Sequence, residues 1–192
     1  MITILTNTFA KVIVACKMLD EPAYKMLKSQ LKDAVDIIDV DVLPTLKSLP
    51  KSGQTLIIID DFVAMKSQQK LRDYVIYARK YNIMLCFLAQ SFYAVDKVIR
   101  QNVGYIVLLS MADKRNLGMI ISTVGSSLDP KVIAHVIATK SKMNVCIIDI
   151  ANPNLNQKLR RNFNDFYTLE DSEGDLLDLN EIQLYTGSGM LN

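Results

Sequence analysis

The sequence predicts an α/β fold built around a mainly parallel, doubly wound sheet. Half of the 192 residues are apolar, which is enough to bury a sizeable core in one domain. Short apolar runs of strand length alternate with helical patterns, as they do in proteins with parallel sheets. The run Leu56–Ile59, within TLIIIDD, is continuous and rich in β-branched residues, which is typical of a central strand buried on both faces.

The first part of the chain supplies the strands on either side of a helix. Residues 11–16 (KVIVAC) form a short apolar strand. In LDEPAYKMLKSQL, Asp20 is the expected N-cap and Pro22 an early helical residue, so an amphipathic helix should follow. A short strand is expected over 35–40, and a loop with Pro and Gly then leads to the central strand, which ends at Asp60 and Asp61.

The same alternation continues to about residue 150. The expected elements are an amphipathic helix over 66–80, strands over 83–90 and 105–110, helices over 112–124 and 129–139, and a last strand over 144–150. Because helical patterns separate the strands, we expect all of these strands to join one parallel sheet.

Charge and cysteine usage narrow the classes of partner and compartment. The net charge is +2, but residues 168–192 hold six acidic and no basic residues, so the rest of the chain has 22 basic and 14 acidic residues. A basic body is compatible with a polyanionic partner. The cysteines have no paired spacing, which favours small buried side chains in a reducing compartment; they are Cys16, Cys86 and Cys146. No apolar stretch reaches the length of a membrane span, so we expect a soluble, intracellular protein.

Polar side chains end two of the expected strands. Two adjacent acids at the carboxyl end of a parallel strand fit a Walker B strand, in which Asp60 holds Mg²⁺ and Asp61 acts on the attacking water. Gln90 ends the next strand and fits a γ-phosphate sensor, although a lone Gln is more often a strand cap. Arg79, at the end of a helix, fits an arginine finger or, alternatively, a solvated cation favoured by the helix dipole.

The ordered block from residue 56 to 102, LIIIDDFVAMKSQQKLRDYVIYARKYNIMLCFLAQSFYAVDKVIRQN, resembles the FtsK-HerA superfamily. It is most similar to genome-packaging ATPases of large double-stranded DNA viruses of the poxvirus and iridovirus type, and the resemblance extends from CKMLDEPAY to RRNFNDFY. The resemblance implies a P-loop NTPase-like (ASCE) three-layer sandwich. It further implies the following roles: Mg²⁺ acid for Asp60, catalytic acid/base for Asp61, sensor for Gln90, finger for Arg79, and nucleotide contacts for Arg100 and Arg115.

One part of the family pattern is missing. None of the seven glycines belongs to a G-x-x-x-x-G-K-[ST] loop, the backbone nest and Lys that hold the β- and γ-phosphates. Residues 2–10 are similar to the helix that follows this loop, so the first strand and the P-loop are expected to be absent. The missing part is either encoded separately or lost, and we do not expect this chain alone to bind or hydrolyse ATP effectively.

The expected function is therefore half of an ATPase motor that moves double-stranded DNA into capsids, with Mg²⁺ and ATP as cofactors. The resemblance implies a homo-oligomeric ring, double-stranded DNA, and capsid proteins or a separate P-loop fragment as partners, with no membrane. It also implies a location in the viral factory of the host cytoplasm or in the virion. The alternatives are a non-catalytic assembly or DNA-binding module and another ASCE motor such as a helicase. We expect residues 1–169 to form the core and residues 170–192 a flexible acidic tail.

Two weaker candidates come from single residues or short clusters. The only histidine, His135, lies among apolar residues and is expected to be a half-buried helical side chain. Lys158, Arg160 and Arg161 form a small basic cluster that could contact DNA phosphates, although a solvated surface is the simpler interpretation.

Overall fold

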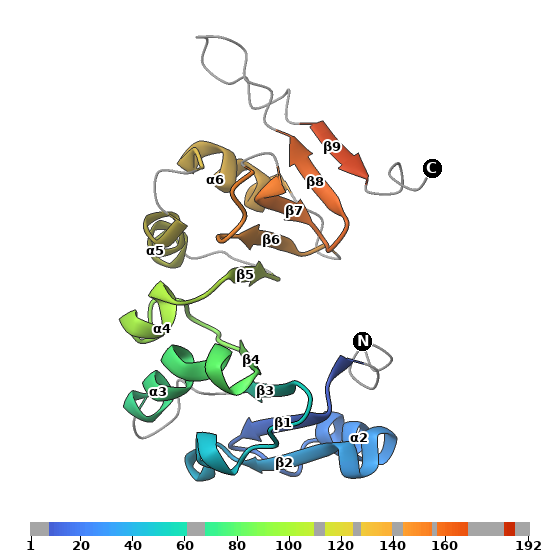
Figure 1. Cartoon of the computed structure of the whole chain (residues 1–192). Helices are drawn as coiled ribbons and strands as arrows, with labels where there is room; N and C mark the ends of the chain where they lie inside the picture. The colour runs from blue at the N-terminus through green and yellow to red at the C-terminus, as the bar shows by residue number, and fades with distance from the viewer. Residues whose placement is uncertain are drawn as a thin grey trace. The chain divides into compact units, whose positions relative to one another are not determined.

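The computed structural model describes residues 8–60, 68–109, 114–124, 128–139, 144–154, 157–168 and 183–186 (Figure 1). The chain divides into two compact units, Met1–Asn102 and Val103–Asn192, which are considered separately below.

The first unit contains a four-stranded parallel sheet in the order β2-β1-β3-β4 (Figure 1). Its strands are β1 (Lys11–Cys16), β2 (Val35–Asp39), β3 (Thr55–Ile59) and β4 (Ile83–Phe87). The register aligns Val14 with Ile37 on one side and Ile58 on the other, and Ile58 in turn with Cys86. The predicted parallel α/β sheet is confirmed here, although β4 ends at Phe87 and does not continue to residue 90 as predicted.

Helices cover both faces of this sheet and make a three-layer sandwich. Strand side chains alternate between the two faces, so Leu56 points to one face and Ile57 to the other. On the first face, Leu31 of α2 (Pro22–Leu31) joins the cluster that contains Leu56. On the second face, Leu71 of α3 (Gln69–Tyr77) joins Ile57, as does Ile99 of α4 (Lys97–Gln101). The predicted amphipathic character of the first two helices is therefore confirmed.

The helix ends differ in detail from those predicted. Pro22 begins α2, but the N-cap residue is Glu21 and not Asp20, and no side chain caps the helix. After Tyr77 the predicted α-helix tightens into a 3-10 turn over Ala78–Tyr81. This turn ends at Asn82, whose left-handed backbone (φ 54) stops the helix and leads into β4.

The turn before β3 depends on a glycine. Gly53 has a positive φ of 79, which L-residues with a side chain rarely adopt. A Cβ atom on Gly53 would lie 2.5 Å from the Cβ of Ala10. The same turn is held by hydrogen bonds from the Ala10 N–H to the Gln54 carbonyl (2.9 Å) and from Asn82 Nδ2 to the Gly53 carbonyl (3.0 Å).

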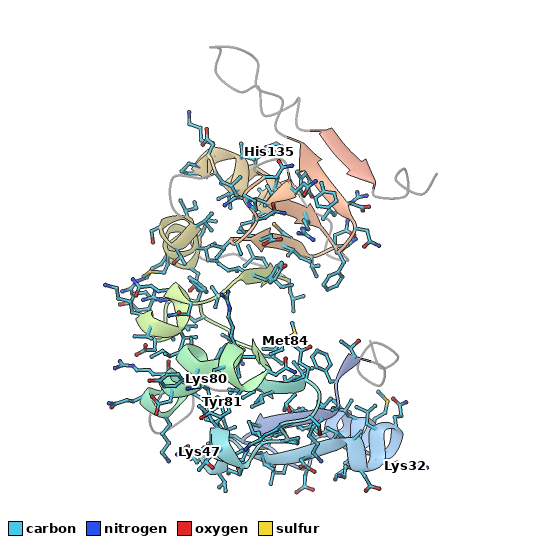
Figure 2. The ribbon with its side chains drawn as sticks, in the orientation of Figure 1. Lys32, Lys47, Lys80, Tyr81, Met84 and His135 are labelled. Atoms are coloured by element: carbon cyan, nitrogen blue, oxygen red, sulfur yellow. The ribbon has the colours of Figure 1, made fainter. Side chains whose placement is uncertain are left out.

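The second unit contains an antiparallel sheet in the order β5-β6-β7-β8-β9. Its elements are β5 (Tyr105–Leu108), α5 (Lys114–Val124), α6 (Pro130–Thr139), β6 (Cys146–Asp149), β7 (Leu159–Arg161), β8 (Asp165–Thr168) and β9 (Gln183–Thr186). The helices are confirmed, and Asp129 opens α6 by accepting a hydrogen bond from the Lys131 N–H (2.7 Å). His135 lies on α6 and is half-buried, as expected (Figure 2).

The expectation that 105–110 and 144–150 belong to the parallel sheet is wrong. In β5, Ile106 and Leu108 are buried whereas Tyr105 and Val107 are exposed, the pattern of a strand with only one covered face. Such strands are typical of antiparallel sheets. The continuous apolar sequence YIVLL hides this alternation, because its exposed residues are also apolar. The predicted division near residue 169 stays a prediction, although β9 lies beyond it.

Candidate functional site at the carboxyl edge of the parallel sheet

All four strands of the first unit are parallel, so their carboxyl ends lie at one edge of the sheet, where α/β proteins commonly bind ligands. Lys17 directly follows β1, Asp39 ends β2, and Asp60 directly follows β3. Gln90 lies three residues beyond the end of β4, which is the direct neighbour of β3. The predicted placement of Asp60 at the end of a central strand, beside the strand that precedes Gln90, is confirmed.

Asp60 is held in place by backbone and side-chain hydrogen bonds. Its N–H donates to the Ala15 carbonyl (2.8 Å), so the pairing with β1 continues past the end of β3. The hydroxyl of Tyr24, on α2, donates to the Asp60 carboxylate. Burial and this hydrogen bond raise the pKa of Tyr24, which keeps its hydroxyl protonated. Burial, with a smaller effect of the Asp60 charge, also raises the pKa of the Cys86 thiol on β4.

A second cluster of charges lies at the ends of β1 and β2. The Lys17 ammonium contacts the Asp39 carboxylate at 3.3 Å and is also hydrogen-bonded to Asp41. The hydrogen bond with Asp41 is the largest of the effects that raise the pKa of Lys17. Lys17 was not among the predicted site residues, although it lies at this edge directly after β1. The signal was available, because Lys17 is the first polar residue after an apolar strand.

The loop that contains Gln90 is attached to the start of α3. Gln68 accepts a hydrogen bond from the Asp96 N–H (2.8 Å) and donates one to the Ala94 carbonyl (3.1 Å). Arg72 forms an ion pair with Asp96 at 2.8 Å, which lowers the pKa of that carboxyl group. Asp96 also caps α4 through the Val98 N–H (2.8 Å).

Gln90 is exposed and lies two residues after Leu88. The Leu88 N–H donates to the Ile59 carbonyl (2.9 Å). The loop therefore leaves the sheet beside the residue that precedes Asp60. The role of Gln90 as a sensor stays a prediction.

The predicted arginines lie in three different environments. Arg79 is exposed in the 3-10 turn Ala78–Tyr81. Arg100, on α4, lies over the Phe92 ring at 5.9 Å, and its Nε and Nη1 atoms are buried without a hydrogen-bond partner among the residues described. Arg115 belongs to the second unit and is exposed near the start of α5. Asp61 lies outside the described residues.

The basic cluster of the second unit is engaged within its own sheet. Lys158 is buried and donates to the Ile150 carbonyl (3.2 Å). Arg160 pairs with Asp149, and Arg161 pairs with Asp165 at 3.2 Å. These contacts agree with a structural function of the cluster, and the proposed phosphate contacts gain no support from them.

The donor set at the edge fits a magnesium ion that arrives with a nucleotide. Within the described ranges, no group of three His, Cys, Asp or Glu side chains is placed to hold a metal ion alone. Mg²⁺, however, is commonly bound by one or two carboxylates together with substrate phosphates and water. Asp60 is half-buried and hydrogen-bonded to Tyr24, and it is one such carboxylate at this edge; its role as a magnesium ligand stays a prediction.

No helix in the described part of the chain is long and apolar enough to cross a membrane.

A search of curated proteins found no match. Among solved structures, the chain is similar to the genome packaging NTPase B204 from Sulfolobus turreted icosahedral virus 2. The match to its complex with sulfate has a TM-score of 0.63 and 13% identity, and it covers 84% of this chain and 84% of that chain. The match to its complex with AMPPCP has a TM-score of 0.62 and 14% identity, with coverage of 84% and 86%.

A third structure, B204, the DNA-packaging ATPase from Sulfolobus Turreted Icosahedral Virus, matches with a TM-score of 0.59, 12% identity, and coverage of 84% and 85%. These likenesses show a shared fold. Residues 22–165, about three quarters of the sequence, match the family described as Poxvirus A32 protein. The chain therefore belongs to the Poxvirus A32 protein family, a family of poxvirus genome-packaging ATPases.

Proposed function

We propose that this chain is the Walker B and sensor half of a viral DNA-packaging ATPase, which couples ATP hydrolysis to the movement of double-stranded DNA into capsids. The observation that best supports the proposal is the carboxyl edge of the parallel sheet. There Asp60 ends β3, and the adjacent strand β4 leads into the loop with Gln90. Membership of the family and the fold shared with packaging NTPases point the same way. The proposed place of action is the viral factory or the virion.

The proposed roles follow from position and charge. Asp60 would hold Mg²⁺, which supplies charge neutralisation for the phosphates. Asp61 would act as acid/base toward water, and Gln90 would sense the γ-phosphate. Arg79 is exposed in the turn that precedes β4, away from the carboxyl edge of the sheet. It is therefore suited to reach a nucleotide on a neighbouring subunit of a ring. Arg100 and Arg115 are proposed phosphate contacts.

We further propose that the P-loop comes from a segment that pairs with β4. Among the described residues, β4 pairs only with β3, so no described strand covers its other edge. The opposite edge strand, β2, is half polar, and its Asp36 forms an ion pair with Lys11 (2.9 Å), which is typical of a natural edge. In contrast, IMLCF of β4 is entirely apolar, and Met84 is 47% exposed. This is the composition of an interior strand, and a parallel strand added there would end beside Gln90.

A non-catalytic module is the second candidate. Such a module would bind DNA or assemble without turning over ATP. A helicase is the third candidate, and it would separate the strands of a duplex, whereas a packaging motor moves along the duplex without opening it.

The test is to restore the missing part. A strand and P-loop from a related packaging ATPase are fused before Ile2, and ATP hydrolysis is measured with and without duplex DNA. We expect activity that rises with DNA and with protein concentration. Asp61→Asn should abolish turnover but leave nucleotide binding nearly unchanged, because it removes the group that acts on water and not the phosphate cradle. A fused protein that folds and binds ATP without turnover would establish the non-catalytic module instead.

Two further experiments test whether Arg79 acts on a neighbouring subunit and whether the P-loop segment pairs with β4. Arg79→Ala should abolish turnover, and mixing it with Asp61→Asn should recover part of the activity, because some interfaces then pair an intact acid with an intact arginine. When the P-loop part is added as a separate polypeptide, Met84→Lys should reduce the recovered activity. Val42→Lys is the matched control, since Val42 is 71% exposed and lies beyond the opposite edge strand. Equal activity of these two lysine variants would contradict pairing along β4.

A further inference from the structure

A pocket of about 830 Å³ lies away from the carboxylate of Asp60, in the first unit. One wall is the segment 40–47, which follows β2 and contains two short 3-10 turns. The other wall is α3 together with the 3-10 turn after it. Neither Asp60 nor Gln90 nor Tyr24 lines the pocket. Its volume is in the range of sites for nucleotides and other small organic groups.

The sequence places the polar lining of this pocket on one side of α3. Lys70, Tyr74, Tyr77 and Tyr81 follow one another at intervals of three or four residues, which brings them to a single helical face. Lys80 extends the same wall. Figure 2 shows Lys80 and Tyr81 in the part of the first unit that also contains Lys47, from the facing wall.

The three lysines of the pocket, Lys47, Lys70 and Lys80, give it a positive rim. Each is exposed, and none forms an ion pair with another described residue. Of the two lining acids, Asp41 is already neutralised by Lys17, which leaves Asp73 as the remaining negative charge. Ammonium groups gathered in this way attract phosphate oxygens as point charges.

Two of the three lining tyrosines, Tyr77 and Tyr81, supply accessible ring surface near these charges. Tyr77 is 47% exposed, and Tyr81 is half-buried. Tyr74 is 6% exposed, and its hydroxyl is buried without a hydrogen-bond partner among the residues described. Aromatic rings that alternate with lysines are the combination that binds unstacked bases together with their phosphates.

We propose that this pocket binds single-stranded nucleic acid, with a base stacked on the tyrosines and neighbouring phosphates on the lysines. Inorganic phosphate would leave most of the pocket unfilled. A base within a duplex is stacked on its neighbours and is not free to lie on Tyr77. An acidic peptide could satisfy the lysines but would not use the aromatic surfaces. The proposal is independent of the Asp60 site and of ATP hydrolysis.

The test uses the whole chain and a fluorescent ten-residue thymidine oligonucleotide, followed by anisotropy in magnesium-free buffer. A uridine ten-mer, a duplex ten-mer and a peptide copying residues 168–181 are the comparison ligands. The thymidine and uridine arms distinguish DNA from RNA as the source of the strand. We expect a strand of either kind to bind more tightly than the duplex and the peptide. A slope of log Kd against log salt of about 2 is expected for three phosphate contacts.

Variants separate stacking from charge. Tyr77→Ala should weaken binding about tenfold, whereas Tyr77→Phe should retain most of the affinity, because the ring and not the hydroxyl stacks. Lys80→Ala should reduce the salt slope by about 0.7. Lys25→Ala removes an equal charge from α2, on the opposite face of the sheet, and should leave the slope unchanged.

Three results would overturn the proposal. The first is equal affinity for strand and duplex with no effect of Tyr77→Ala. The second is equal effects of Lys80→Ala and Lys25→Ala. The third is binding of the acidic peptide without binding of either oligonucleotide, which would assign the pocket to an acidic protein segment.

Discussion

Replacing Tyr24 by Phe removes one hydroxyl group, and this tests how Asp60, the candidate metal ligand, is held in place. In Tyr24→Phe the ring keeps its packing beside Leu27 and the buried Leu31, but the hydrogen bond to Asp60 is lost. A hydrogen bond to a charged acceptor contributes about 1.5–3 kcal/mol when it is well shielded from water. Both side chains are only half-buried, so we expect the variant to lose about 1 kcal/mol of unfolding free energy at pH 7.

This difference should depend on pH in a defined direction. The pKa of Tyr24 is raised above the value of about 10 that it has in the unfolded chain. Its contribution is therefore complete below pH 10 and is lost as the pH rises further, because only the unfolded chain then releases the proton readily. By pH 11 most of the contribution of about 1 kcal/mol should therefore be lost. The wild-type chain and Tyr24→Phe should then be about equally stable.

Urea unfolding followed by circular dichroism at pH 7 and pH 11 measures both quantities. Tyr77→Phe is the control, because Tyr77 is 47% exposed and its hydroxyl forms no hydrogen bond with another described side chain. That variant should match the wild type at pH 7. The reasoning is refuted if Tyr24→Phe is as stable as the wild type at pH 7, or if its deficit is unchanged at pH 11.

Three other predictions address the nucleotide, the β3 turn and the loop after β4. Titration of this chain with Mg·ATP in a calorimeter should give almost no heat, because a missing P-loop removes hydrogen bonds that together account for about 10²–10⁶ in affinity; micromolar binding would contradict this. Gly53→Ala should destabilise the chain by about 2 kcal/mol or more in thermal unfolding, through its positive φ and the contact with Ala10, whereas Gly104→Ala, with open space around it, should be nearly neutral. Asp96→Ala should lose about 1–2 kcal/mol as cap and ion-pair partner of Arg72, and Asp96→Asn should recover most of it. Because the pKa of Asp96 is lowered, the advantage of the wild type over Asp96→Asn should disappear as the pH falls through that pKa, which stability curves between pH 7 and pH 2 would show.

The sequence predicted an element correctly where its pattern of apolar residues matches the faces that the structure buries. The run Leu56–Ile59 is apolar without interruption because both of its faces are covered, and this pattern identified the central strand and the position of Asp60. Gln90 was placed beside it by the same reasoning. The end of β4 was placed too late, because LAQ continues the apolar pattern after the strand has stopped pairing at Phe87.

Contacts between distant segments were not predictable in the same way. Tyr24 reads as a core residue of an amphipathic helix, and only the packing of α2 on the sheet brings its hydroxyl to Asp60. The pocket is a second example. Lys47 and Tyr77 are 30 positions apart, and no local pattern shows that their segments face each other. The direction of β5 was also hidden, since Tyr105 and Val107 are apolar but exposed.

The edge of β4 that no described strand covers has a consequence for the protein in a cell. An apolar strand edge with Met84 and Leu88 exposed (47% and 45%) is a template for self-association. Two copies joined along β4 would form an off-pathway soluble dimer or the start of an aggregate. Either product would remove subunits from the proposed ring. On the proposal that a further segment pairs with β4, copies whose β4 is not yet covered would be open to this self-association and would be cleared by chaperones and proteases.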